Sequence, residues 1–233
     1  SSLRLYPYQF APYFIKRLKI QPLQYYSEML FEIMKSENSY DILPNFTAAD
    51  IVRLIGIGRN EYIDMMNKVR SKKWLWKIRK GFIKQYLPKT LKDVDIEYWW
   101  IVKVTALPPE PAIYTLYNSL GPLEVQTIED LRHHQLIYAC ELDKLTLQNL
   151  YKKQLIYFEI PVAASDYITI PPTAMKKFVM NRLTNDPFEK IMYDILVAID
   201  ERTTIGELAA TLEINLNLVK YAVTVYCRLG FAK

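Results

Sequence analysis

The sequence predicts a mainly α-helical protein, made of tandem helix-turn-helix or winged-helix-like units with one or two small β-hairpins. Two observations predict this fold class. Apolar residues recur at helical spacing on both sides of a glycine-containing turn near the start of the chain, and the same pattern returns near its end. The 233 residues are 51% hydrophobic, enough for one large core or two to three small ones. We therefore expect units at residues 1–94, 95–177 and 178–233, packed as one domain.

The first unit is predicted from the residues around one turn. A helix is expected over residues 25–34, followed by an inserted loop at about residues 38–45. Thr47 is the expected cap of the next helix, and Gly56 supplies the backbone freedom that ends it. A second helix then runs to Arg70, so this part of the chain is predicted to form a helix-turn-helix.

The C-terminal unit repeats this pattern. Helices are expected over residues 188–199, from Thr203 or Thr204 to residue 212, and over residues 216–228. When Glu213 is placed over Gly56, six positions of the two units coincide. The aligned pairs are Leu208 with Ile51, Ala209 with Val52, Leu212 with Ile55, Ile214 with Ile57, Val219 with Tyr62, and Ala222 with Met65. We infer an internal repeat of a three-helix unit.

The middle unit is less regular. Helices are expected over residues 97–103 and 127–140, and a short helix over residues 146–153. The hydrophobic period then changes to two in residues 155–160 and 167–170, and a proline follows each of these segments. A short helix followed by a two-stranded hairpin is the outline of a winged helix, which we predict here.

One stretch of the chain concentrates positive charge. Residues 68–92 hold ten Lys or Arg and no Asp or Glu, which leaves 20 positive and 25 negative charges in the rest of the chain. Within this stretch, residues 73–81 are either a second wing or a continuing helix. A cationic stretch of this kind either contacts an acidic partner or is a solvated face without a partner.

Catalytic and cofactor chemistry has little basis in this sequence. The six glycines form no GxGxxG or Walker-type string, and no GxSxG nucleophile motif is present. On a helix the adjacent His133 and His134 diverge by about 100°, so together with Cys140 they do not complete a metal site. Cys140 and Cys227 are too few for a disulfide framework. We therefore predict a cytoplasmic protein that is not an enzyme and holds no cofactor or metal.

Two further expectations concern the whole chain. The sequence has no uncharged run of about 18 apolar residues, so no membrane-spanning helix is predicted. The chain starts at Ser1 without a methionine or a signal peptide, and we expect it to be a fragment of a longer protein.

Nucleic-acid binding is the competing hypothesis for helix-turn-helix units beside a basic stretch. Direct readout would need a cationic second helix in the major groove. In the first unit, however, Arg59 and Asn60 are followed by the acidic Glu61 and Asp64. We keep a nucleic-acid-binding tandem winged-helix protein as the alternative, and expect no nucleic-acid partner.

Five strings in the chain resemble one known family. They are LPNFTAAD at residues 43–50, GIGRN at 56–60, WW at 99–100, FVMNR at 178–182 and YCRLGFA at 226–232. These strings resemble the N-terminal domain of the proteins called "family with sequence similarity 91", and the similarity extends through nearly the whole chain.

The resemblance implies a non-enzymatic cytoplasmic scaffold, peripheral at the trans-Golgi network and on vesicles. Proteins of the family act with a WD-repeat protein of the same complex and with a TBC-domain adaptor that links endosome-derived vesicles to golgins. The N-terminal domain is expected to bind a short segment of that adaptor, so contact with golgins and with membranes is indirect.

Three groups of residues are candidates for the partner-binding site. Exposed aromatic residues among cations suit contacts with an acidic or aromatic peptide, which favours the basic stretch. Next come two residues of the first helix-turn-helix, and third the exposed side of the predicted hairpin, because an open strand edge accepts an extended peptide. In this order the candidates are Lys72, Lys73, Trp74, Trp76, Lys77, Arg79 and Lys80, then Arg59 and Tyr62, then Ile156, Phe158 and Ile160.

Overall fold

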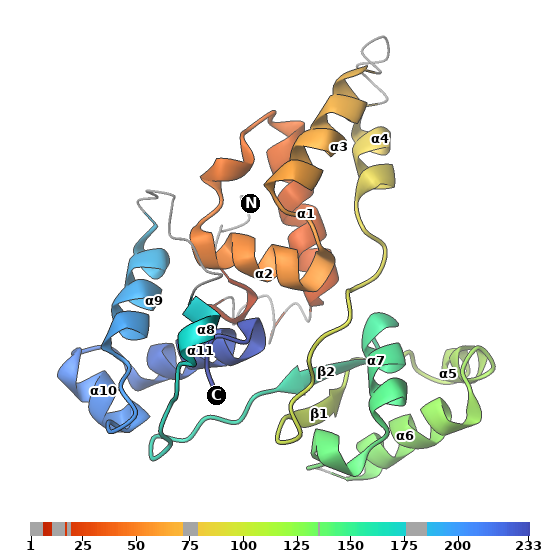
Figure 1. Cartoon of the computed structure of the whole chain (residues 1–233). Helices are drawn as coiled ribbons and strands as arrows, with labels where there is room; N and C mark the ends of the chain where they lie inside the picture. Colours follow the sequence, from red (N-terminus) through yellow and green to blue (C-terminus); the bar gives the residue numbers. More distant parts are fainter. Residues whose placement is uncertain (1–6, 11–16, 18–19, 72–78, 135, 176–185) are drawn as a thin grey trace. The chain divides into compact units, whose positions relative to one another are not determined.

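The computed structural model divides into two compact units (Figure 1), and it describes residues 7–10, 17, 20–71, 79–134, 136–175 and 186–233. Unit 1 consists of Ser1–Lys89 and Val162–Lys233, and unit 2 of Thr90–Pro161. The first and third predicted segments therefore share one unit, while the boundary expected at residue 177 lies outside the described residues. The predicted mainly α-helical class is confirmed, with one small antiparallel sheet of two strands.

The N-terminal part of unit 1 contains the predicted helix-turn-helix. Its elements are the 3-10 turns η1 (Tyr8–Phe10) and η3 (Tyr40–Ile42) and the helices α1 (Pro22–Lys35), α2 (Asn45–Ile55), α3 (Arg59–Ser71) and α4 (Arg79–Tyr86). Gly56 ends α2 in the left-handed conformation at φ 74°, as predicted. The cap predicted at Thr47 is wrong, because α2 already begins at Asn45.

The reason for the earlier start of α2 lies far away in the sequence. The backbone N–H groups of Asn45 and Phe46 donate to the carboxylate of Glu189, at 2.9 and 3.3 Å. Glu189 therefore satisfies the first N–H groups of α2, which would otherwise need a local capping side chain. Thr47 is left inside the first turn and is fully buried.

The C-terminal part of unit 1 repeats the helix-turn-helix. It contains α8 (Pro172–Met175), α9 (Pro187–Ala198), α10 (Ile205–Thr211) and α11 (Leu216–Leu229). Thr204 caps α10, and its side chain and that of Glu207 satisfy each other's backbone N–H groups. Glu213 takes a left-handed conformation at φ 55°, like Gly56, which confirms their alignment. Three aligned pairs differ in burial: Val52 is exposed whereas Ala209 is buried, and Ile55 and Ile57 are buried whereas Leu212 and Ile214 are half-buried.

The two repeats contact each other through α2 and α11. The rings of Phe46 and Tyr226 lie 5.7 Å apart, and both side chains are fully buried. Beside them the Arg228 guanidinium donates to Asp50, with N–O distances of 2.6 and 3.1 Å. The Tyr26 hydroxyl of α1 also donates to Asp50. A polar cluster is thus enclosed where α1, α2 and α11 meet.

Unit 2 differs from the predicted winged helix. It contains β1 (Ile101–Val104), α5 (Ala112–Tyr117), α6 (Pro122–His133), the 3-10 turn η5 (Ala139–Glu141), α7 (Lys144–Lys152) and β2 (Ile156–Glu159). The helix predicted over residues 97–103 is wrong, because Ile101–Val104 form strand β1, in which Val102 is buried, and Trp100 just before the strand is buried as well. The predicted hairpin is wrong as well, since β2 pairs with β1, with Val102 opposite Phe158.

Two other features of the middle region also depart from expectation. Helix α6 starts at Pro122, earlier than predicted, because Glu124 accepts a hydrogen bond from the backbone of Gly121 and so caps the helix. It ends at His133, because the residues that follow run beside β1. The segment expected to be the second hairpin strand belongs to unit 1, where Tyr167 forms a bridge with Thr204.

Candidate functional site

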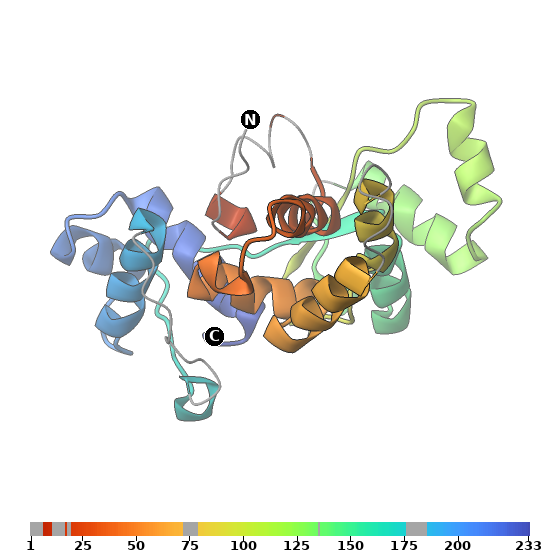
Figure 2. The same cartoon turned by 90° about the horizontal axis from the view of Figure 1, so that it is seen from above.

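Most of the described part of the basic stretch lies on two neighbouring helices, α3 and α4, which we call the basic helix pair (residues 59–71 and 79–86), and Lys89 and Lys92 follow α4. The two helices contact each other and lie side by side in both views (Figures 1 and 2). Five of the leading candidates lie between α3 and α4, outside the described residues. They are Lys72, Lys73, Trp74, Trp76 and Lys77. Arg79 and Lys80 are in the first turn of α4, so from residue 79 onward the segment is helical.

The sequence of α3 explains which of its faces is free. Tyr62, Met65, Met66 and Val69 recur at three- and four-residue spacing and are buried, which fixes α3 on unit 1. The opposite face, which includes Lys68, is exposed. The cations of α3 are concentrated in its last turn, where they also interact favourably with the helix dipole.

Helix α4 adds cationic side chains to this surface. Ile83 anchors the helix in the core, and the neighbouring Lys84 is exposed. The Lys84 ammonium lies 5.6 Å from the ring centroid of Phe31 on α1, a cation–π contact that keeps the charge at the surface. Lys68 and Lys84 form no ion pair with any described residue, so their charges are available to an anionic ligand.

The other cations of α3 are partly neutralised. Arg59 lies 2.8 Å from Asp41, and Arg70 lies 3.8 Å from Glu37. All four of these side chains are more than a third exposed, so solvent weakens both ion pairs. A stronger anion can therefore replace Asp41 or Glu37 as the partner of the arginine.

Tyr62, the companion of Arg59 among the candidates, is a core residue. Its hydroxyl donates to the backbone carbonyl of Asn38 at 2.7 Å, and its ring lies 5.4 Å from that of Tyr40. Burial raises the pKa of Tyr62 to about 12. Of this pair only Arg59 lies at the surface, and Tyr62 instead holds α3 against η3.

The strand candidates are mainly buried, main chain included. Ile156 is 1% exposed and Ile160 is 8% exposed, while Phe158 is half-buried. The Phe158 ring packs on Trp100 and Tyr151, with centroids 5.7 and 5.3 Å away. These three residues therefore fix the position of β2, and Ile156 and Ile160 offer almost no accessible surface to a ligand.

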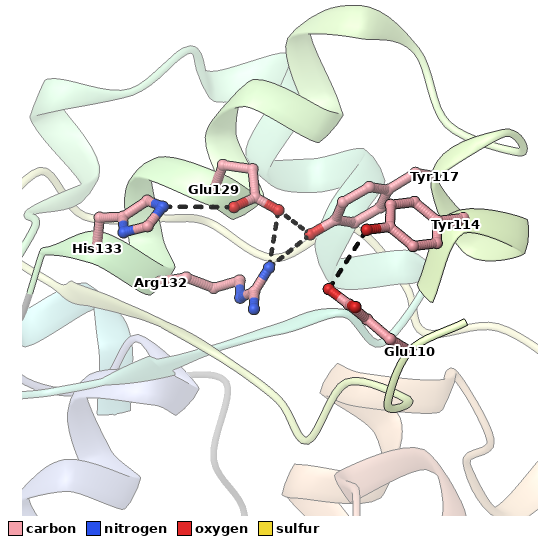
Figure 3. Close-up of polar contacts among 6 residues, drawn as sticks. All are labelled: Glu110, Tyr114, Tyr117, Glu129, Arg132 and His133. Carbon is pink, nitrogen blue, oxygen red and sulfur yellow. Dashed lines mark hydrogen bonds and ion pairs between the residues drawn. The ribbon is translucent and has the colours of Figure 1, made fainter. Parts of the chain in front are cut away.

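Unit 2 also contains a polar cluster that sequence reasoning missed (Figure 3). The Tyr117 hydroxyl on α5 donates to Glu129 on α6. Arg132 donates to the same carboxylate at 2.9 Å and to the Tyr117 hydroxyl at 3.2 Å, and His133 lies 3.6 Å from Glu129. The only signal in the sequence was the spacing of Glu129, Arg132 and His133 by three and four residues.

The electrostatics of this cluster indicate a structural role. The hydrogen bond from Tyr117 lowers the pKa of Glu129, so this carboxylate is a weak base. Burial, together with the hydrogen bond to Glu129, raises the pKa of Tyr117 and makes its hydroxyl a poor nucleophile. In the same region Tyr114 donates to Glu110 at 3.3 Å (Figure 3). The contact of Tyr117 with Glu129 holds α5 on α6. The contact of Tyr114 with Glu110 joins α5 to the segment that precedes it.

Among the residues that the structure describes, no three His, Cys, Asp or Glu side chains are placed to hold a metal ion. His133 and His134 have separate contacts, since Nδ1 of His134 lies 2.9 Å from the carbonyl of Asp130. None of the helices described here has the length and apolar character needed to cross a bilayer.

Fold and site together define a helical protein with paired helix-turn-helix repeats, a cationic helix pair on the repeat unit and a second, mixed unit inserted in the chain. Comparison with known protein families matches residues 1–233, the whole chain, to the family described as FAM91 N-terminus. The chain belongs to this family, which confirms the resemblance carried by its five sequence strings.

Proposed function

We propose that this chain is a scaffold domain that binds a short segment of a TBC-domain adaptor protein, in golgin-dependent capture of endosome-derived vesicles at the trans-Golgi. Its family membership supports a Golgi-related scaffold role. The WD-repeat protein of the same complex is the second expected partner. The domain acts on the cytoplasmic side and meets the membrane only through these partners.

The observation that favours peptide docking is the exposed cationic surface of the basic helix pair. Lys68 and Lys84 project from two helices that contact each other, and Arg70 adds a charge that is weakly held by Glu37. Such a surface attracts an acidic segment and raises its association rate, while apolar anchors of the ligand supply most of the affinity. We therefore expect the adaptor segment to carry acidic residues beside an apolar or aromatic anchor.

Calorimetric titration with the central segment of the adaptor tests this proposal. Lys68→Glu combined with Lys84→Glu is expected to weaken binding at least tenfold at physiological salt, because two favourable charges become repulsive. Replacing Lys72, Lys73, Lys77 and Lys80 by Glu is expected to act in the same direction. Lys190→Glu combined with Arg202→Glu makes the same change in net charge on exposed residues of α9 and the following turn, and is the control. Unchanged affinity of the Lys68/Lys84 variant would exclude the basic helix pair as the docking surface.

Short duplex DNA is the control ligand for the alternative function. The helix-turn-helix repeats favour that alternative, but Glu61 and Asp64 are exposed on α3, the helix that would face the phosphates. Binding of DNA that falls steeply with salt, without binding of the adaptor segment, would replace the scaffold function by nucleic-acid recognition.

A further inference from the structure

Helix α3 carries a line of three exposed side chains, Arg59, Ile63 and Arg70, which we call the α3 stripe. At about 3.6 residues per turn, these positions lie within about 40° of one another around the helix axis. Ile63 is 45% exposed, and the side chains of Arg59 and Arg70 are 60% and 49% exposed. The stripe therefore presents one apolar side chain between two cations, on the solvent face of α3.

The helix-turn-helix fold does not require this stripe. In the C-terminal repeat, the aligned positions of α11 are Leu216, Lys220 and Cys227, so neither arginine has a counterpart. The connection before α2 differs too, because it has nine residues, 36–44, whereas the connection before α10 has six, 199–204. The N-terminal repeat thus has both an arginine pair and a longer connection, and the C-terminal repeat folds without them.

The longer connection supplies an anion for each arginine. Asp41 lies 2.8 Å from Arg59, and Glu37 lies 3.8 Å from Arg70. Solvent reaches both ion pairs, so each contributes little to stability. The two carboxylates occupy the positions that the carboxylates of an acidic ligand would take.

The main chain of this connection is fixed by hydrogen bonds. Tyr40 is buried, and its hydroxyl donates to the Ile57 carbonyl at 2.8 Å. The Asn38 carbonyl accepts a hydrogen bond from the Tyr62 hydroxyl at 2.7 Å. Only the two exposed carboxylates therefore have to leave their arginines when a ligand binds, and the main chain can stay in place.

The spacing of the two ion pairs defines the length of the ligand. Arg59 and Arg70 are eleven positions apart, about 16 Å along α3. Glu37 and Asp41 are only four positions apart and contact both arginines. An extended segment covers about 13 Å over four residues and places every second side chain on one face. Acidic residues at the first and fifth positions of such a segment, with an apolar residue at the third, match the two arginines and Ile63.

We propose that the α3 stripe binds an extended segment of a partner protein, with acidic residues at its first and fifth positions and an apolar residue at its third. The two ligand carboxylates replace Asp41 and Glu37 at the arginines, and the apolar side chain packs on Ile63. Because the connection competes for each arginine, a segment with one acidic residue displaces only one carboxylate and binds more weakly. That the partner is the adaptor rests on the proposed function, whereas the pattern of the ligand rests on the α3 stripe alone.

The test uses the whole chain and a seven-residue peptide, blocked at both ends, with aspartate, leucine and glutamate at its second, fourth and sixth positions and glycine or serine elsewhere. We expect saturable shifts of the Ile63 and Arg70 amide signals in an NMR titration. The control peptide has the same composition with its two acidic residues adjacent. It is expected to bind at least tenfold more weakly, because it reaches only one arginine.

Substitutions in the protein separate competition from general attraction. Arg59→Gln combined with Arg70→Gln is expected to weaken peptide binding at least tenfold. Lys190→Gln combined with Arg202→Gln makes the same charge change on exposed residues elsewhere in unit 1 and is expected to change binding less than twofold. Asp41→Asn is expected to strengthen binding severalfold, because one competing carboxylate is removed. In the Arg59→Gln chain the same substitution is expected to have no effect, because the competition acts through Arg59.

Equal binding of the two peptides would overturn the proposal, and so would an equal gain from Asp41→Asn with and without Arg59. The adaptor segment is then titrated against the same variants. If its binding is unaffected by Arg59→Gln combined with Arg70→Gln, the α3 stripe is not its site, although the scaffold function stands. If the adaptor segment does not bind while the peptide still binds at the α3 stripe, the proposed function is contradicted and the stripe is supported.

Discussion

A buried ion pair joins the two helix-turn-helix repeats. The side chain of Asp50 is fully buried and that of Arg228 is 10% exposed. Two charges removed from water are costly, but here the Asp50 carboxylate accepts hydrogen bonds from both Arg228 and Tyr26. Burial, followed by the charge of Asp50, raises the pKa of Tyr26 well above its ordinary value, so this hydroxyl stays a donor at all physiological pH values. The pair therefore depends on both partners being present.

Asp50→Asn is expected to lower the free energy of unfolding by about 3 kcal/mol, because it leaves the Arg228 charge buried without a carboxylate. The loss is measured as a shift of the urea unfolding midpoint. Asp41→Asn makes the same chemical change in an exposed pair with Arg59 and is expected to cost less than about 1 kcal/mol. Similar losses for the two variants would contradict the assigned role of Asp50.

At the scale of elements, the two repeats place different residues in the same backbone conformation. Gly56 and Glu213 both have positive φ at the turn between two helices, but only glycine adopts this region without steric cost. The C-terminal repeat therefore carries strain in its turn that the N-terminal repeat avoids.

Gly56→Ala and Glu213→Gly form a matched pair of substitutions for this turn. The first is expected to reduce the free energy of unfolding by about 1 kcal/mol, because alanine is strained at φ 74°. The second is expected to leave it unchanged or raise it by up to about 1 kcal/mol, because relief of strain offsets the greater freedom of the unfolded chain. Thermal unfolding of both variants checks this. A destabilised Glu213→Gly variant would show that Glu213 makes a needed contact.

The elements that sequence reasoning predicted are those with local signals. Gly56 and Thr204 mark helix ends through their own conformation or hydrogen bonds. The repeat followed from the six positions that coincide when Glu213 is placed over Gly56. Strand β1 was missed because the aromatic run before Ile101 hides the period of two, and because its partner β2 lies more than fifty residues away in sequence. The cap of α2 was missed for the same reason, since Glu189 is remote. Of the predicted site residues on the basic helix pair, Arg59 lies at the surface, whereas Tyr62 proved to be core. Lys68 and Lys84 were not singled out by the sequence, which marked them only as members of the basic stretch.

At the scale of the whole molecule, unit 2 is an insertion between the two halves of unit 1. Its sheet and helices find partners within residues 90–161, as in the hydrogen bonds between Val94 and Gln148 and the ion pair of Glu124 with Lys153. The N-terminal half of unit 1, by contrast, takes core partners from α9 and α11. The two parts therefore differ in their ability to fold alone.

A fragment of residues 90–161 is expected to unfold cooperatively on heating, because α6, α7 and the two strands pack on one another. A fragment of residues 1–89 is expected to lack a cooperative transition, because Phe46 and Asp50 lose Tyr226 and Arg228. Circular dichroism and NMR chemical-shift dispersion of both fragments make the comparison, with the whole chain as reference. A cooperative transition in the 1–89 fragment would show that α11 is dispensable for its core.

The pairing of Asp50 with Arg228 has a further consequence while the protein is made on the ribosome. The two residues are 178 positions apart in sequence. At ordinary translation rates, roughly 10 to 40 s pass between their synthesis. During that interval the nascent chain exposes the apolar face of α2, while the inserted unit, complete at Pro161, is free to fold. The N-terminal half is therefore the segment most exposed to aggregation and to chaperone binding until α11 emerges.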